Sequence, residues 1–426
     1  MPRPALLITL TALVAAFSSI AGEAHKPITS PYTYNNDVFP ILRDQCGRCH
    51  APGGVAPMSL MTYKEAFPWG ESIRTELIAG HMPPGATDQA AGTFRSTREL
   101  SARELNILLV WLTGGTPMGN AEHSPPTVAL PQSWPLGVPD LVIPMPSTFS
   151  IAGEATEDRQ EIVLQTHIAE PRWLRAVDLL PGTPAIVRSA TVSVKPAAPV
   201  GGSEPGRATN LARRDTDELI AAERMLAVWS PGDTPVALDG GPAFQLPANA
   251  ELVLRVHYKK TWENERLAMT DRSSVGLYFA AAPATALRAL TVAPSDEVVR
   301  AFGSSRASVP PENGSQSASL SFDRIVDEDL EAVALYFDGA LANVHLAVQA
   351  ERPDGTRVDL IRFRPQADWA KRYWLATPVS LPRGTRITVT AMLADVLLPP
   401  GAAPLASKRP DASALRLTVN VVGKND

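Results

Sequence analysis

The stretch at residues 46–50 reads Cys-Gly-Arg-Cys-His, and it decides how the first third of the chain is interpreted. Two thiols one helical turn apart can form thioether bonds to the two vinyl groups of one porphyrin. The histidine that follows then lies beneath the iron. The motif therefore predicts one covalently attached c-type haem, with thioethers to Cys46 and Cys49 and with His50 as the proximal iron ligand.

Two other interpretations of this stretch are a redox-active dithiol and half of a zinc site. Cys46 and Cys49 are the only cysteines of the chain, so a zinc site would need two more ligands of another kind nearby. A redox dithiol of this spacing is typical of a strand–helix–strand context, and no strand pattern precedes Cys46. Haem attachment is the interpretation that the motif favours.

Five side chains downstream of the motif could supply the distal iron ligand: Met58, Met61, His81, Met82 and Met118. Met82 follows the end of an expected helix and precedes Pro83-Pro84, which would hold its loop rigid. We therefore expect Met82 to be the distal ligand. Axial ligation by one His and one Met raises the reduction potential of a haem. Met58 and Met61 can equally be explained as core packing.

The region from residue 33 to residue 118 has the helix signals of a small all-α domain. One helix is expected from Glu71 to Ala79, stopped by Gly80. Another is expected after Ser101 and Glu104, which have the spacing of a capping box and precede the apolar run 105–112. The sequence predicts a compact helical domain that presents the Cys-Gly-Arg-Cys-His motif.

The first 24 residues have the features of a signal peptide. Arg3 provides the positive charge, and Ala5–Phe17 is an apolar stretch too short for a stable membrane anchor. Cleavage is expected after Ala21 or Ala24, and an uncleaved anchor is the alternative. We expect a periplasmic or otherwise exported protein with no membrane span in its mature chain.

The composition of the 426-residue chain is that of a globular protein of two or three domains. Hydrophobic residues make up 45% and charged residues 19%, and the formal net charge is -5. The sequence has no long basic run, which argues against nucleic acid as a partner. Prolines crowd residues 119–146, so this stretch is expected to be an extended linker without helix or strand.

From residue 147 onward the sequence alternates between apolar and polar residues with a period of two. Leu252, Leu254, Val256 and Tyr258 form the clearest example. Short alternating runs separated by turn residues are typical of antiparallel β-sandwiches. We expect two of them, at 147–284 and 285–424, joined near Ala282-Pro283.

Several stretches around the motif resemble a monohaem cytochrome c domain over Tyr34–Gly119. The matching stretches are residues 37–42, 56–60, 82–84 and 100–111. In that family the methionine before the two prolines is the distal ligand, which implies the same role for Met82. Such domains occur at the N-terminus of bacterial proteins whose C-terminal half is monooxygenase-like.

The β half resembles the copper type II, ascorbate-dependent monooxygenases, the group of the peptidylglycine and dopamine hydroxylases. The best matching stretches are residues 229–232, 246–247, 252–258, 353–355, Trp369 with Tyr373, and 381–385. The resemblance implies two sequential jelly-roll-like domains, each holding one copper. The expected fold class is thus multidomain, a small all-α domain followed by two all-β jelly-roll-like sandwiches.

The copper ligands of that family are mostly missing at the matching positions. Arg188 and Ser189 stand where a His-His pair is expected, and His257 keeps the third ligand of the first site. Asp338 and Ala340 stand where the second site has His-x-His, and the stretch near Ala414 and Leu415 lacks its methionine. His257 is the only retained position and is expected to be empty, so copper is not an expected cofactor.

Three functions from different classes follow from these observations. The first is an exported c-type cytochrome acting in electron transfer, with no catalytic residue of its own. Its degenerate monooxygenase-like region would be a scaffold for a redox partner protein or a small electron donor. The second is a copper monooxygenase with rearranged ligands, supplied with electrons by the haem. The third is a binding or assembly module that contains haem. We favour the first.

Overall fold

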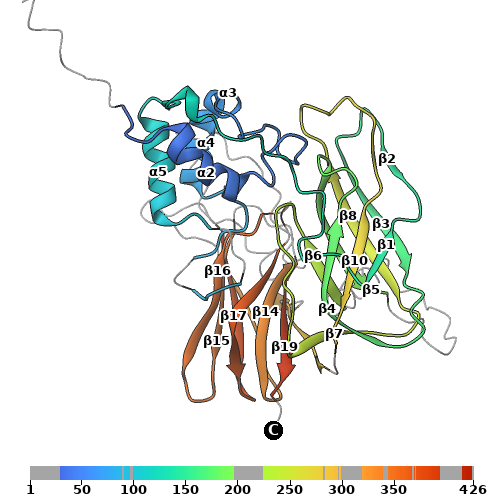
Figure 1. Ribbon diagram of the computed structural model, residues 1–426. Coiled ribbons are helices and arrows are strands. Elements are labelled where there is room, and N and C mark those ends of the chain that lie inside the picture. Colours follow the sequence, from blue (N-terminus) through green and yellow to red (C-terminus); the bar gives the residue numbers. More distant parts are fainter. Residues whose placement is uncertain are drawn as a thin grey trace, which may run out of the picture.

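The computed structural model places a helical segment against one end of a larger β region (Figure 1). In Figure 1 the helices lie above strands β16 and β17, and the strands of the first half of the β region lie beside them. The structure describes residues 29–88, 91–95, 99–195, 224–281, 284–295, 297–298, 319–338, 344–366, 369, 371–393 and 415–424. The expected signal peptide, residues 1–24, lies outside the described residues.

The helical segment is built from short and partly irregular helices. Its elements are η1 (Tyr34–Val38), α2 (Phe39–Ile41), η2 (Leu42–Cys46), α3 (Tyr63–Ala66), η3 (Phe67–Trp69), α4 (Gly70–Ala79), α5 (Ala102–Thr113) and η4 (Ala121–His123). η1 and η2 are π-helical turns on either side of α2. Tyr34, Leu42, Leu108 and Trp111 are buried at the centre of one small core.

The two longest helices end and begin where the sequence predicts. α4 stops at Gly80, which adopts the left-handed conformation with φ 68° that glycine tolerates. α5 begins with the expected capping box: Ser101 accepts a hydrogen bond from the Glu104 backbone, and the Glu104 side chain accepts one from the Ser101 backbone. Both predictions are confirmed.

The first half of the β region contains two larger sheets and a short ribbon. Its strands are β1 (Leu141–Pro144), β2 (Phe149–Ile151), β3 (Glu157–Gln165), β4 (Arg172–Leu180), β5 (Val187–Val194), β6 (Met225–Trp229), β7 (Pro242–Leu246), β8 (Glu251–Lys259), β9 (Met269–Asp271), β10 (Ser274–Phe279) and β11 (Thr285–Ala286). One sheet has the order β1-β10-β4-β7-β11, the other β3-β8-β5-β6, and β2 pairs with β9. Residues of both larger sheets share one core, in which Leu252, Leu254, Val256 and Tyr258 of β8 are fully buried.

The second half repeats this arrangement with two further sheets. Its strands are β12 (Arg288–Val292), β13 (Ser319–Ile325), β14 (Leu330–Asp338), β15 (Val344–Glu351), β16 (Arg357–Phe363), β17 (Arg372–Leu381), β18 (Arg386–Leu393) and β19 (Arg416–Gly423). The sheet orders are β12-β19-β14-β17 and β13-β18-β15-β16, and both sheets contribute to a second core. The two halves touch where Arg372 of β17 donates hydrogen bonds to the backbone carbonyls of Met225 and Leu226 in β6.

The stretch expected to be a structureless linker contains regular structure. Strand β1 pairs antiparallel with β10, with Leu141 opposite Leu277 and Pro144 opposite Ser274. A proline can occupy this place because β1 is an edge strand and Pro144 is its last residue. The short helix η4 lies in the same stretch.

The fold class predicted from the sequence is wrong. The described residues are mainly β, with 40% of them in strands and 15% in helices, and the larger sheets take an arrangement like that of a four-bladed propeller, rather than an all-α domain followed by two jelly-roll-like sandwiches. A period of two identifies a strand but not its partner. The pairing of β1 with β10, far apart in the sequence, cannot be read from such a pattern. The helical segment also joins the sheets, since isolated bridges connect Thr87 with Phe363 and Phe94 with Leu375.

Candidate functional site

The Cys-Gly-Arg-Cys-His motif forms one tight turn at the end of η2. The backbone N–H groups of Cys49 and His50 both donate to the carbonyl of Cys46, at 3.0 and 2.8 Å. Gly47 allows this turn, because a Cβ atom there would come within 2.5 Å of the Arg43 carbonyl oxygen. The two thiols and the imidazole are therefore presented from a single turn of backbone.

The His50 imidazole is held by a backbone carbonyl. Its Nδ1 lies 3.0 Å from the carbonyl oxygen of Met58. A carbonyl oxygen can only accept, so Nδ1 carries the proton and Nε2 keeps its lone pair. Burial lowers the pKa of His50, while the bond to Met58 acts in the opposite direction. The ring is thus neutral and oriented, which is the state in which a histidine binds a metal.

The two cysteines do not form a disulfide with each other, and both are half-buried; Cys46 packs against the helical core. Burial raises the pKa of Cys46 to about 12, and the neighbouring Cys49 adds to the shift. The Cys49 thiol donates to the carbonyl oxygen of Pro231 at 3.5 Å. A redox-active dithiol requires a lowered thiol pKa, so this environment argues against that interpretation of the motif.

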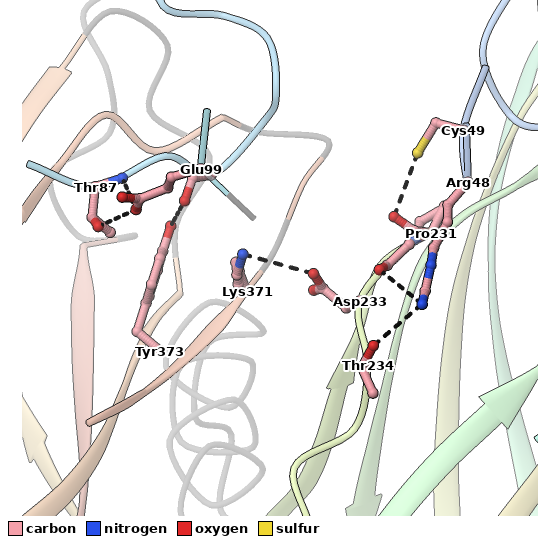
Figure 2. A network of polar contacts seen from close by, with 11 residues as sticks. Arg48, Cys49, Thr87, Glu99, Pro231, Asp233, Thr234, Lys371 and Tyr373 are labelled. Carbon is pink, nitrogen blue, oxygen red and sulfur yellow. Dashed lines mark hydrogen bonds and ion pairs between the residues drawn. The ribbon is translucent and has the colours of Figure 1, made fainter. Parts of the chain in front are cut away.

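One side of the motif packs against a clamp loop, residues 230–234, which lies between β6 and β7 (Figure 2). Arg48 donates from Nη1 to the Gly232 carbonyl oxygen at 3.3 Å and to Thr234 Oγ1 at 3.2 Å. Gly232 has φ 87°, and a Cβ atom there would lie 3.3 Å from Cβ of Arg48 and 3.8 Å from Cys49 Sγ. The clamp loop therefore fits the motif closely at a position where glycine is required.

The clamp loop also connects the motif to the second half of the β region. Asp233 Oδ1 lies 3.7 Å from Nζ of Lys371, at the start of β17. Figure 2 shows this ion pair between the clamp loop on one side and Tyr373 with Glu99 and Thr87 on the other. Tyr373 donates to the Gly85 carbonyl oxygen at 3.3 Å. Three separate polar contacts thus lie between Arg48 and the loop that follows Met82.

The loop that carries Met82 is fixed to the edge of the β region. Arg364 Nη1 donates to the Ala79 carbonyl oxygen at 3.3 Å, and Gln366 Nε2 donates to that of His81 at 3.0 Å. A hollow of about 250 Å³ lies beneath this loop, and His345, Arg362 and Met392 are among its lining residues. The loop is therefore held by more than the two prolines that the sequence pointed to.

The candidate distal ligands differ in their surroundings. Met61 is 3% exposed within the helical core, and Met58 is packed against the same core. His81 is exposed, and its Nδ1 lies 3.1 Å from Glu76 Oε2 on the surface of α4. Met118 is 38% exposed, whereas Met82 is half-buried. These surroundings leave Met82 as the prediction to be tested.

The residues at the expected first copper position lie on neighbouring strands. Ser189 of β5 stands opposite His257 of β8 in the sheet register. His257 is 4% exposed, and its Nε2 lies 2.8 Å from Glu157 Oε1 on β3. The Arg188 guanidinium lies 5.1 Å from the centre of the Trp369 ring. The structure therefore places Ser189 opposite His257, whose Nε2 is bound to a carboxylate.

The residues at the expected second copper position are only partly described. Asp338 ends β14, Leu415 is buried, and Ala340 and Ala414 lie outside the described residues. Among the residues that the structure describes, no three or more His, Cys, Asp or Glu side chains are grouped to hold a metal ion.

In the same part of the chain, no helix is both long enough and apolar enough to cross a membrane.

Sequence reasoning missed the residues that hold the motif from outside. The sequence indicated no role for Arg48, Asp233 or Lys371. Pro231-Gly232 is a recognisable turn signal. That signal gives the turn but not the surface against which it packs, more than 180 residues away in the sequence.

Comparisons with known proteins give no family for this chain. No family model and no curated protein matches it. The predicted resemblance to a monohaem cytochrome c domain fused to a copper type II monooxygenase-like region is therefore wrong. It was built from short stretches such as 229–232 and 353–355, whose proline and glycine residues are required by turns in many unrelated folds.

Among solved structures, the chain is similar to the N-terminal CBM22-1-CBM22-2 tandem domain of Paenibacillus barcinonensis Xyn10C. The identity is 10%, over 68% of this chain and 98% of that chain, with a TM-score of 0.16. A Paenibacillus xanthan lyase matches at 11% identity, over 73% of this chain and 28% of that chain, with a TM-score of 0.14. At such TM-scores neither likeness carries an argument about fold or function.

Proposed function

We propose that this chain is an exported c-type cytochrome that transfers electrons, with one covalent haem held by Cys46, Cys49 and His50. The observation that carries the proposal is the His50 imidazole. Its Nδ1 is 3.0 Å from the Met58 carbonyl oxygen, which leaves Nε2 deprotonated. The ring stands in one backbone turn with two thiols that are not joined in a disulfide, as the attachment chemistry requires.

The residues of the motif fit a haem in three ways. Each thiol can add across a vinyl group, with the sulfur bonding to one carbon and its hydrogen passing to the other. The His50 imidazole is neutral, as a metal ligand must be. Apolar residues of the helical core lie beside Cys46. When bound, the haem would supply a one-electron centre whose potential its axial ligands set.

The proposed role of the β region is that of a scaffold for the redox partner. The clamp loop contacts Arg48 and Cys49, while Arg364 and Gln366 hold the backbone before Met82. Two sides of the helical segment are thus fixed by different parts of the β region. Such an arrangement would limit how a partner protein, or a small electron donor, approaches the haem.

The attachment experiment uses the full chain produced in a host that attaches c-type haem. We expect Cys46→Ala with Cys49→Ala to remove all haem that survives a denaturing gel, because both thioethers are lost. Met61→Leu is the matched control: it changes a buried neighbour of the motif, keeps both thiols and should retain the stain. Haem staining of the denatured double mutant would contradict the proposal, as would unstained wild-type protein.

A further inference from the structure

A cavity of about 60 Å³ lies between the two halves of the β region. It is lined by β4, β6 and β7, by residues 233–236 that follow β6, and by the start of β17. Five charged side chains contribute to its wall: Arg95, Asp178, Asp233, Lys371 and Arg372. The cavity is thus polar although it lies beside a hydrophobic core.

Arg372 is the residue that makes this cavity unusual. Its side chain is 8% exposed, and its Nη1 and Nη2 atoms donate to the carbonyl oxygens of Leu226 and Met225 at 2.9 and 2.8 Å. The guanidinium lies 5.3 Å from the ring centre of Phe244 and 5.5 Å from that of Trp374. Nε is buried and has no hydrogen-bond partner.

No carboxylate of the described chain forms an ion pair with Arg372. Its hydrogen bonds go to neutral carbonyl groups, and desolvation lowers the pKa of the guanidinium to about 10. A buried cation without a counter-charge is costly, and so is a buried donor without an acceptor. The first of these costs would be relieved by an anion in the cavity beside the guanidinium.

The other charged residues that line the cavity also favour the binding of an anion. Lys371 is largely buried, and its 3.7 Å separation from Asp233 leaves room for another acceptor. Arg95 adds a second guanidinium from the segment before α5. Asp178 is buried and accepts a hydrogen bond from the Leu179 backbone, and burial raises the pKa of its carboxyl to about 7. Below that pH Asp178 is neutral, so the wall has an excess of positive charge.

We propose that this cavity binds a small oxyanion, a carboxylate or a tetrahedral phosphate or sulfate, through Arg372 and Lys371. A cavity of this kind needs roughly 10–15 Å³ for one water molecule, so the space corresponds to about four to six heavy atoms. Acetate, phosphate and sulfate have that size. None of its five charged residues belongs to the motif, although Asp233 lies in the clamp loop that contacts Arg48.

The test is calorimetric titration of the full-length protein with sodium acetate, phosphate and sulfate, each at constant ionic strength against sodium chloride. We expect saturable binding of at least one oxyanion, with one site per chain. A preference for acetate assigns a carboxylate ligand, and a preference for phosphate or sulfate assigns a tetrahedral one. Chloride alone should give no saturable heat, and absence of saturable binding by all three oxyanions would overturn the proposal.

Variants locate the binding in this cavity. Arg372→Gln should abolish it, and Lys371→Gln should weaken it about tenfold or more, the loss of one charge-assisted hydrogen bond. Arg357→Gln removes an exposed arginine that pairs with Glu351 far from the cavity and should leave the affinity unchanged. If Arg372→Gln does not fold, Lys371→Gln decides the matter. An unchanged affinity in Lys371→Gln would overturn the proposal.

Discussion

Two histidines, the half-buried His50 in the helical segment and the buried His257 in the β region, show how the hydrogen-bond partner decides what an imidazole can do. His50 places Nδ1 at a backbone carbonyl and keeps Nε2 available. His257 places Nε2 itself at the carboxylate of Glu157, 2.8 Å away. The first arrangement is that of a metal-binding histidine with its outer partner. In the second, Nε2, the nitrogen that stays available in His50, is already bound to a carboxylate. Burial does not predict this difference, since His257 is the more deeply buried of the two.

The largest expected effect is the loss of the proximal ligand. In His50→Ala the haem stays attached through both thioethers, but the visible spectrum should lose the features of a six-coordinate iron. Added imidazole should restore them, because it occupies the same position. His257→Ala should leave the spectrum unchanged. A normal spectrum in His50→Ala would contradict the assignment of His50 as the iron ligand. An altered spectrum in His257→Ala would contradict the claim that His257 has no part in binding the iron.

The distal side should show the next largest effect. Met82→Ala should lower the reduction potential by on the order of 0.1 V, since axial ligands set haem potentials over a wide range. It should also remove the weak absorption band of the thioether–iron bond. The controls Met58→Ala and Met61→Ala should retain that band. Loss of the band in either control, with the band retained in Met82→Ala, would show that the control residue and not Met82 is the distal ligand.

Asp178 provides a pH-dependent test within the β region. Burial raises its folded-state pKa from the ordinary 3.8 to about 7, so folding favours the protonated acid. The free energy of unfolding should therefore fall as the pH rises from about 4 to about 7, by up to a few kcal/mol. Asp178→Asn should remove this fall, as measured by urea unfolding in a buffer without oxyanions.

The matched control for that experiment is Asp239→Asn. Asp239 has an exposed carboxylate that pairs with Arg175 at 3.4 Å. This variant should keep the wild-type dependence of stability on pH. An Asp178→Asn profile with the same slope as the wild type would show that the Asp178 carboxyl is already ionised when the chain is folded at neutral pH.

The smallest expected effect concerns the contact between the two regions. Gly232→Ala places a Cβ atom in the left-handed region and 3.3 Å from Arg48, which should cost about 1–2 kcal/mol. Gly240→Ala has a similar φ, 80°, but no atom within 4 Å of the new Cβ. Thermal unfolding should show a larger loss for Gly232→Ala. Equal losses of stability in the two variants would mean that the close contact between the clamp loop and Arg48 adds nothing to the cost of the substitution.

The sequence predicted what depends on neighbouring residues. The stop of α4 at Gly80 and the capping box of α5 follow from local backbone chemistry, and both are confirmed. The buried face of β8 could be predicted from the sequence, because the alternation of apolar and polar residues along a strand depends only on neighbouring residues. The motif at 46–50 could likewise be recognised as a candidate site from five residues.

What failed depends on contacts between distant residues. The fold class was wrong because strand partners such as β1 and β10 are chosen by the whole chain. The clamp loop could not be foreseen from Arg48, nor the unpaired Nε of Arg372 from its sequence neighbours. Arg372 follows Lys371 in a stretch that looks like an exposed strand start, yet packing between the two halves buries it.

The measurement that tests the central claim most directly is the intact mass of the purified, denatured wild-type chain, taken together with its iron and copper content. The account predicts a mass increased by one haem, about one iron per chain and no stoichiometric copper after copper has been offered. A chain whose denatured mass equals that of the polypeptide alone would contradict it, as would two tightly bound copper ions remaining after dialysis.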